Sequence, residues 1–192
     1  PTPTVRMENL RAELKRQGLD GFIIPRSDEH QGEYVAQHSE RLAWLTGLSA
    51  SAGLAIAMIN AAAVFVDGRY ILQAEAQVSG EILERNHLID EPATDWIADN
   101  LSKGGKLGYD PWLLTPGQVS RYAAACEQAG GTLVPVSTNP VDAVWNNQPP
   151  PPLAPVWCLD EAFTGETVAA KRRRIADGLS EAGEDAALLS AP

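Results

Sequence analysis

Apolar residues follow two different spacings along the first part of the chain. Some segments repeat them every three or four positions, as amphipathic helices do, while others hold them in short runs typical of buried strands. The two kinds of segment alternate. We predict helices at residues 4–17, 40–47, 69–78, 95–103 and 116–130, and strands at residues 19–25, 54–59, 62–67, 81–89, 106–110 and 132–136.

This alternation indicates an α/β domain in which helices flank a β-sheet. Asn60 is a natural turn residue between two neighbouring strands, so we expect a hairpin there and a mixed sheet. We predict that Thr4, Thr94 and Thr115 cap the N-termini of their helices, since threonine side chains accept hydrogen bonds from free backbone N–H groups. Gly18 is the predicted stop of the first helix.

The composition changes at residues 146–155, which read NNQPPPPLAP. Consecutive prolines cannot donate ladder hydrogen bonds and favour extended polyproline geometry, so this stretch predicts a semi-rigid linker. We expect a first domain at residues 1–145, a Pro-rich linker at 146–156 and the incomplete start of a second, related domain at 157–192.

The second domain is expected because the opening of the chain recurs after a shift of 165 residues. The matching positions are Leu10 with Ile175, Leu14 with Leu179, Gly18 with Gly183, Asp20 with Asp185, and Ile23-Ile24 with Leu188-Leu189. We therefore predict a helix from about Val168 to Ala182, followed by a strand. A lone helix and strand cannot close a core, so the chain is expected to belong to a longer protein. The apolar face of this helix should pack on the first domain, pair with a second copy of the chain, or be mobile.

Composition and charge exclude several classes of partner. Hydrophobic residues make up 44% and charged residues 21%, which is an ordinary globular balance. The 25 acidic and 15 basic residues give a formal charge of −10, which disfavours nucleic acid, and the basic run at 171–174 is expected to be a solvated helix face. The longest apolar stretch, residues 53–66, is too short to cross a membrane. Two cysteines without a CxxC pair, and an N-terminus that lacks a signal-peptide pattern, make a cytoplasmic location the default.

A loop rich in ionisable residues follows the first predicted strand, where α/β folds often build their sites. It contains Asp28, Glu29, His30 and Glu33. Carboxylates with an imidazole can bind a metal or act as acid and base, but no HExxH or spaced ligand pair is present. A solvated loop is therefore favoured over a metal site, whereas contact with a substrate or another subunit stays open.

A second candidate, Asp67-Gly68-Arg69-Tyr70, joins a predicted strand to a helix. Arg69 is interpreted either as part of a buried or half-buried ion pair within a structural turn, or as a ligand contact. These residues supply no complete catalytic site. They indicate an acidic α/β domain that serves something larger.

Several motifs occur in one order along nearly the whole chain. They are FIIPRSDEHQGEY (22–34), RLAWLTGLSASAG (41–53), FVDGRYILQAEAQV (65–78), DWI (95–97), LGYDPWLLTP (107–116) and VDAVWNNQPPPPLAP (141–155). In this order they resemble the N-terminal domain of cytosolic Xaa-Pro aminopeptidases, which are metallopeptidases of the creatinase/prolidase type. The fold implied is a mixed sheet flanked by helices, as in creatinase N-terminal domains.

The resemblance implies a three-domain enzyme whose first two domains share a fold, which would account for the recurrence. Its third domain holds two divalent metal ions, usually manganese, and cleaves the bond before proline in peptides with proline in second position. The catalytic residues and metal ligands would then lie outside these 192 residues, so this fragment alone should bind no metal and be inactive. The partners implied are the peptide, the chain's own catalytic domain and a second copy in a homodimer.

The same resemblance makes Asp28, His30, Glu33 and Arg69 candidates for substrate-entrance or subunit contacts, since the N-terminal domain borders the active-site entrance. If the loop faces the catalytic domain, its carboxylates would attract a peptide's protonated α-amino group. Replacing Asp28 and Glu33 by Ala would then raise KM more than it lowers kcat. Two alternatives stay open, namely a catalytically inactive relative that binds peptides or proteins, and a relative that hydrolyses another small amide.

Overall fold

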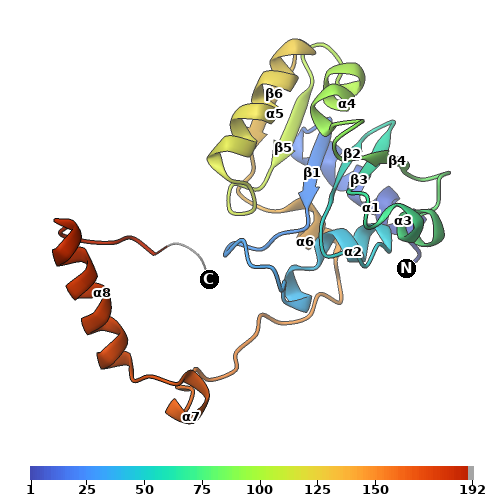
Figure 1. Ribbon diagram of the computed structural model, residues 1–192. Coiled ribbons are helices and arrows are strands. Elements are labelled where there is room, and N and C mark those ends of the chain that lie inside the picture. The colour runs from blue at the N-terminus through green and yellow to red at the C-terminus, as the bar shows by residue number, and fades with distance from the viewer. Residues whose placement is uncertain (190–192) are drawn as a thin grey trace. The chain divides into compact units, whose positions relative to one another are not determined.

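The computed structural model describes residues 1–189. The chain divides into two compact units, Pro1–Pro152 and Leu153–Pro192. The first unit contains a sheet flanked by helices (Figure 1), and each unit is described by itself.

The sheet of the first unit has six strands in the order β4-β3-β2-β1-β5-β6. The strands are β1 (Gly21–Pro25), β2 (Leu54–Met58), β3 (Ala62–Val66), β4 (Glu84–His87), β5 (Lys106–Tyr109) and β6 (Thr132–Pro135). β2 pairs antiparallel with both β1 and β3, and the remaining neighbours pair in parallel. The mixed sheet is confirmed, and the β2–β3 hairpin turns at Asn60 as predicted.

Helices form at all five predicted places in the first unit, with small shifts at their ends. The helical segments are α1 (Pro3–Gln17), η1 (Gln37–Ser39), α2 (Arg41–Thr46), α3 (Ile71–Gln77), α4 (Ala93–Asn100), α5 (Pro116–Gln128) and α6 (Pro140–Val144). The short segments η1 and α6 are additions to the prediction. Two predicted caps are wrong by two residues, because Thr2 caps α1 and Pro92 occupies the N-cap position of α4. Thr115 caps α5 as predicted, in a reciprocal capping box with Gln118.

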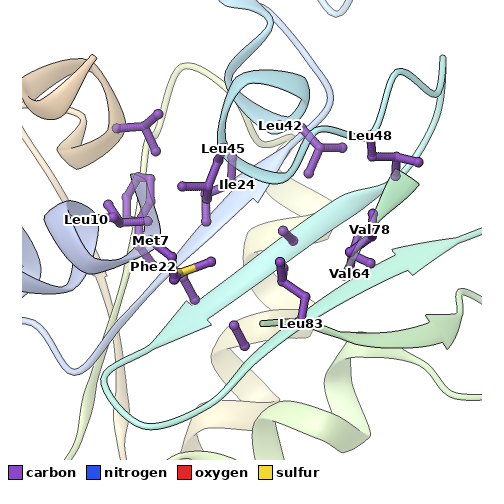
Figure 2. Packing of buried hydrophobic residues seen from close by; sticks show 14 of the residues in the cluster. Met7, Leu10, Phe22, Ile24, Leu42, Leu45, Leu48, Val64, Val78 and Leu83 are labelled. Carbon is purple, nitrogen blue, oxygen red and sulfur yellow. The ribbon is translucent and has the colours of Figure 1, made fainter. Parts of the chain in front are cut away.

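The sheet buries both of its faces, because alternate residues of each strand point to opposite sides. In β1, Phe22 and Ile24 join one cluster and Ile23 joins the other. The first cluster contains buried apolar residues of α1, α2, α3 and α6, and Figure 2 shows its Leu10 and Leu45 close to Phe22 and Ile24. The second cluster contains the apolar residues of α4 and α5. β1, β2 and β3 are buried along their whole lengths, as their continuous apolar runs require.

The carboxyl ends of β1, β3 and β5 lie at one edge of the sheet. β5 is parallel to β1, and β3 has the direction of β1 because each pairs antiparallel with β2. The loop after β1, the turn after β3 and the loop after β5 therefore emerge at this edge, which we call the carboxyl edge. The topology thus brings both predicted candidate segments, 28–34 and 67–70, to one side of the molecule.

The second unit contains α7 (Glu161–Thr164) and α8 (Val168–Ala182). α8 repeats α1 at the predicted shift, from the threonine N-cap to the C-terminal glycine. Thr2 and Thr167 both accept a backbone N–H with their side chains, and Gly18 and Gly183 adopt left-handed φ angles of 68° and 73°. No residue of α8 is buried. Its assignment to a second, related domain stays a prediction.

The strand expected after α8 does not form within the described residues. Leu188 and Leu189 have no regular secondary structure and are 94% and 82% exposed, and the end of the predicted strand, residues 190–192, lies outside the described part. A strand needs a neighbour for its backbone hydrogen bonds, and no second sheet is present among residues 153–189 to supply one.

Truncation of a single buried leucine side chain in α1 should destabilise the first unit. Leu10 is 0% exposed, so Leu10→Ala should lower the free energy of unfolding by about 2–5 kcal/mol through lost burial and a cavity. Urea unfolding followed by tryptophan fluorescence measures the change. The matched control is Leu72→Ala in α3, whose side chain is 79% exposed and should shift stability by only about 0.5 kcal/mol. Equal effects of the two substitutions would contradict the described core.

Candidate functional site

The loop after β1 is organised around a buried carboxylate. Asp28 is 7% exposed. Its Oδ1 accepts the backbone N–H of His30 at 3.0 Å and that of Gly32 at 3.1 Å. Such side-chain-to-backbone bonds replace the secondary structure that the loop lacks. Asp28 therefore holds the loop in shape through its Oδ1 atom.

Two polar side chains join this loop to the loop after β5. Ser27 Oγ donates to the carbonyl oxygen of Leu113 at 2.8 Å, and Gln31 Nε2 donates to the same oxygen at 3.2 Å. Gln31 has a positive φ of 54°, the strained left-handed region for a non-glycine residue. These bonds across the carboxyl edge make the two loops one connected surface.

Arg26 supports the far end of the same loop. Its Nη1 donates to the carbonyl oxygen of Glu33 at 2.5 Å, and its Nη2 lies 3.6 Å from a carboxylate oxygen of Glu40. The Arg26 side chain is only 10% exposed, so its positive charge is largely shielded from solvent by the surrounding chain. Burial raises the pKa of Glu40, and the nearby Arg26 partly opposes that shift.

The remaining ionisable groups of the loop face solvent. His30 is 79% exposed along its side chain, and its Nε2 lies 3.8 Å from a carboxylate oxygen of Glu29. Glu33 is also exposed, and its side chain appears in no ion pair within 4.0 Å among the described residues. The structure thus separates Asp28, which holds the loop, from Glu29, His30 and Glu33, which are available for contact.

Arg69 pairs within its own turn. Its guanidinium donates to both carboxylate oxygens of Asp67, at 3.0 and 2.8 Å. This hydrogen-bonded pair lowers the pKa of Asp67 and raises the pKa of Arg69, to which Glu33 also contributes through its charge. The expected ion pair is present, but the Arg69 side chain is 68% exposed rather than buried.

Tyr70, the last residue of this turn, extends the polar cluster. Its hydroxyl lies 2.5 Å from Ser51 Oγ, a hydrogen bond that lowers the pKa of Tyr70. The Arg69 guanidinium carbon lies 5.2 Å from the centroid of the Tyr70 ring. Both candidate segments emerge at the carboxyl edge, because β1 and β3 run in the same direction.

Sequence reasoning missed two exposed aromatic residues at this edge. Tyr34 ends the loop after β1 and is 90% exposed, while Trp112 lies in the loop after β5 and is 75% exposed. Large aromatic side chains in solvent commonly mark contact surfaces. The sequence could have indicated these two aromatic residues only through the parallel pairing of β1 and β5. That pairing brings the loops after both strands to the same edge of the sheet.

Among residues 1–189, no group of three or more histidine, cysteine or acidic side chains could hold a metal ion. Burial raises the pKa of the Cys126 thiol to about 11, so Cys126 is a core residue rather than a reactive one. Within the same range, no helix is long and apolar enough to cross a membrane.

Comparison with known proteins gives one consistent result. The family model described as "Creatinase/Prolidase N-terminal domain" matches residues 6–144. Human Xaa-Pro aminopeptidase 2 is 39% identical over 165 residues, which are 85% of this chain and 24% of the human protein. The Drosophila melanogaster Xaa-Pro aminopeptidase ApepP is 36% identical over 182 residues, 91% of this chain and 29% of that protein. The chain thus spans about a quarter of the length of the curated relatives it matches.

Solved structures agree with these relatives. A cytosolic X-prolyl aminopeptidase from Caenorhabditis elegans, with a di-nuclear active site, has a TM-score of 0.78 and 27% identity, covering 95% of this chain and 32% of its own. The N-terminal domain of the cytoplasmic peptidase PepQ from Mycobacterium tuberculosis has a TM-score of 0.56 and 25% identity. It covers 73% of this chain and 98% of its own.

The role of Asp28 can be separated from that of its charge. Asp28→Ala leaves the backbone N–H groups of His30 and Gly32 without their acceptor. This loss should destabilise the loop by about 1–3 kcal/mol. Amide hydrogen exchange at His30 and Gly32 should accelerate accordingly. Asp28→Asn keeps an acceptor oxygen and should retain most of the protection, and the exposed Glu29→Ala should leave it unchanged. Unaltered exchange in Asp28→Ala would refute the assigned role.

Proposed function

Since this chain belongs to the creatinase/prolidase N-terminal domain family, we propose that it is the N-terminal, non-catalytic domain of a metal-dependent Xaa-Pro aminopeptidase. Such an enzyme removes the first residue from peptides with proline in second position. The observation that carries the proposal is the 39% identity to human Xaa-Pro aminopeptidase 2 over 85% of this chain. The order of the matched motifs along the sequence supports the same branch of the family.

The metal-dependent chemistry is assigned to another part of the protein. Two divalent metal ions, manganese in this proposal, would activate water for attack on the peptide bond. The di-nuclear active site of the Caenorhabditis elegans neighbour supports two ions. The side chains of residues 1–189 offer no cluster of three potential ligands, so this domain would contribute shape and charge to the enzyme rather than metal ligands. We place the enzyme in the cytoplasm, by analogy with that cytosolic neighbour.

The carboxyl edge is proposed to face the path of the substrate. Its exposed groups, Glu29, His30 and Glu33, lie on a loop held from beneath by Asp28 and Arg26. A peptide substrate presents a protonated α-amino group, which an exposed carboxylate attracts over several ångströms. Arg69, whose Nε and Nη2 donate to Asp67, would instead shape the surface. Contact with a second copy in a homodimer is the other use of this edge.

A binding role without catalysis is the second candidate function. It is favoured by the exposed Tyr34 and Trp112, which suit a surface that holds a peptide or protein. In this case the whole protein would be a catalytically inactive relative. The two candidates differ only in whether peptide bonds are cleaved.

Activity of the whole protein decides between them. The full-length polypeptide, supplied with Mn²⁺, should release the N-terminal residue of an Xaa-Pro-containing tripeptide, and chelation should abolish the release. The 192-residue chain alone should be inactive under the same conditions. A full-length protein that binds the tripeptide without cleaving it would replace the peptidase function by the binding function.

The charge of Glu33 should affect substrate capture. In the active full-length enzyme, Glu33→Gln should raise KM for short Xaa-Pro peptides up to about fivefold with little change in kcat, because an exposed, screened charge contributes about 1 kcal/mol or less. The rise should diminish at high salt. Glu8→Gln is the matched control, since Glu8 lines a hollow beside Asn60 at the opposite end of the sheet. Equal KM values for the Glu33 and Glu8 variants would contradict this role while leaving the activity itself intact.

A further inference from the structure

Two helical segments far apart in the sequence face each other in a regular series of contacts. Arg41 of α2 donates from Nε and Nη2 to the two carboxylate oxygens of Asp142 in α6, at 2.7 and 2.8 Å. One turn further along each helix, Trp44 stacks on Trp145 with ring centroids 5.1 Å apart and planes inclined by 17°. The Arg41 side chain is 9% exposed and that of Asp142 is 30% exposed, so this two-bond ion pair is partly buried and joins α6 to α2.

The series continues beyond α6 into the Pro-rich segment. Gln148 Nε2 donates to Asp142 Oδ1 and to the carbonyl oxygen of His38, each at 2.9 Å. His38 Nδ1 lies 2.7 Å from the carbonyl oxygen of Pro149. Since a carbonyl oxygen only accepts, Nδ1 must carry the proton of this bond. His38, Arg41 and Trp44 thus each contact one residue of the segment that runs from α6 to Pro149. Their partners are Pro149, Asp142 and Trp145, respectively.

The chemistry suits a proline-rich ligand. A run of prolines offers no backbone N–H donors, so carbonyl oxygens along the run can accept hydrogen bonds from a neighbouring surface. Surfaces that bind polyproline segments supply donors for these carbonyls beside aromatic rings. His38 supplies the donor here, and Trp44 of α2 supplies an aromatic ring that stacks on Trp145, just before the Pro-rich segment.

We infer that the η1–α2 face is a docking surface for the chain's own Pro-rich segment, with His38 and Gln148 as its clamp. The clamp makes Asn146–Pro149 part of the first unit, in line with the extension of that unit to Pro152. The linker therefore starts after Pro149, rather than at the composition change at Asn146. His38 is a positioning residue, which sets the point where the following chain leaves the first unit. This inference holds whichever of the proposed functions is correct.

Backbone dynamics of the 192-residue chain test the clamp directly. In ¹⁵N relaxation measurements on the wild type, the Gln148 amide should be as ordered as that of Val144 in α6, and clearly more ordered than that of the fully exposed Val156. His38→Ala should lower the order of Gln148 towards that of Val156. His38→Asn should restore it, because an asparagine amide nitrogen can take the place of Nδ1 as the donor.

The exposed His30→Ala is the matched control and should leave the order of Gln148 unchanged. Thermal unfolding of each variant separates local release from general loss of structure, because the clamp predicts a large change at Gln148 with a small change in Tm. Should His38→Ala fail to fold, Gln148→Ala reports on the same amide at position 148. A Gln148 amide as mobile as Val156 in the wild type, or equally ordered in wild type and His38→Ala, would overturn the inference.

Discussion

The structure of the first unit depends on the pairing of β1 between β2 and β5. All five residues of β1 are buried, with Phe22 and Ile24 in one core cluster and Ile23 in the other. An antiparallel neighbour on one side and a parallel neighbour on the other make this strand the centre of the mixed sheet. Both helical layers pack against it. Its carboxyl end also delivers the loop that carries the candidate site, so the site's position follows from the core.

Some polar groups at the carboxyl edge are buried and stabilise the loop after β1, whereas others on the same loop are exposed to solvent. Asp28 and Arg26 are largely buried and bond to the backbone of the loop. Glu33 and His30, on the same loop, remain exposed. The hydrogen bonds of Asp28 and Arg26 hold the loop in one conformation. An acidic surface that is already ordered can attract a cationic group without a further loss of conformational entropy. This division explains how a loop of ionisable residues can serve recognition without forming a catalytic site.

The sequence predicted the elements whose signal is local. Continuous apolar runs identified β1, β2 and β3, and Asn60 identified the hairpin between β2 and β3. Thr115 with Pro116 identified the start of α5. Composition could not distinguish Asp28 from Glu33, because the distinction lies in backbone N–H groups that meet only one of the two side chains. Docking of the Pro-rich segment was equally hidden, since His38 and Pro149 are separated by 111 residues. The predicted strand at Leu188 and Leu189 had the right apolar pattern but has no neighbouring strand among the described residues.

A role within a larger metallopeptidase, as proposed above, accounts for the family match over residues 6–144 together with a chain that spans 24% of its human relative. The most direct test is the intact mass of the native polypeptide, isolated from its source cell with an antibody against the first unit. We expect a mass several times the 20.6 kDa of this chain. A native polypeptide of 20.6 kDa would contradict it, because such a chain would have no room for a metal-binding catalytic domain.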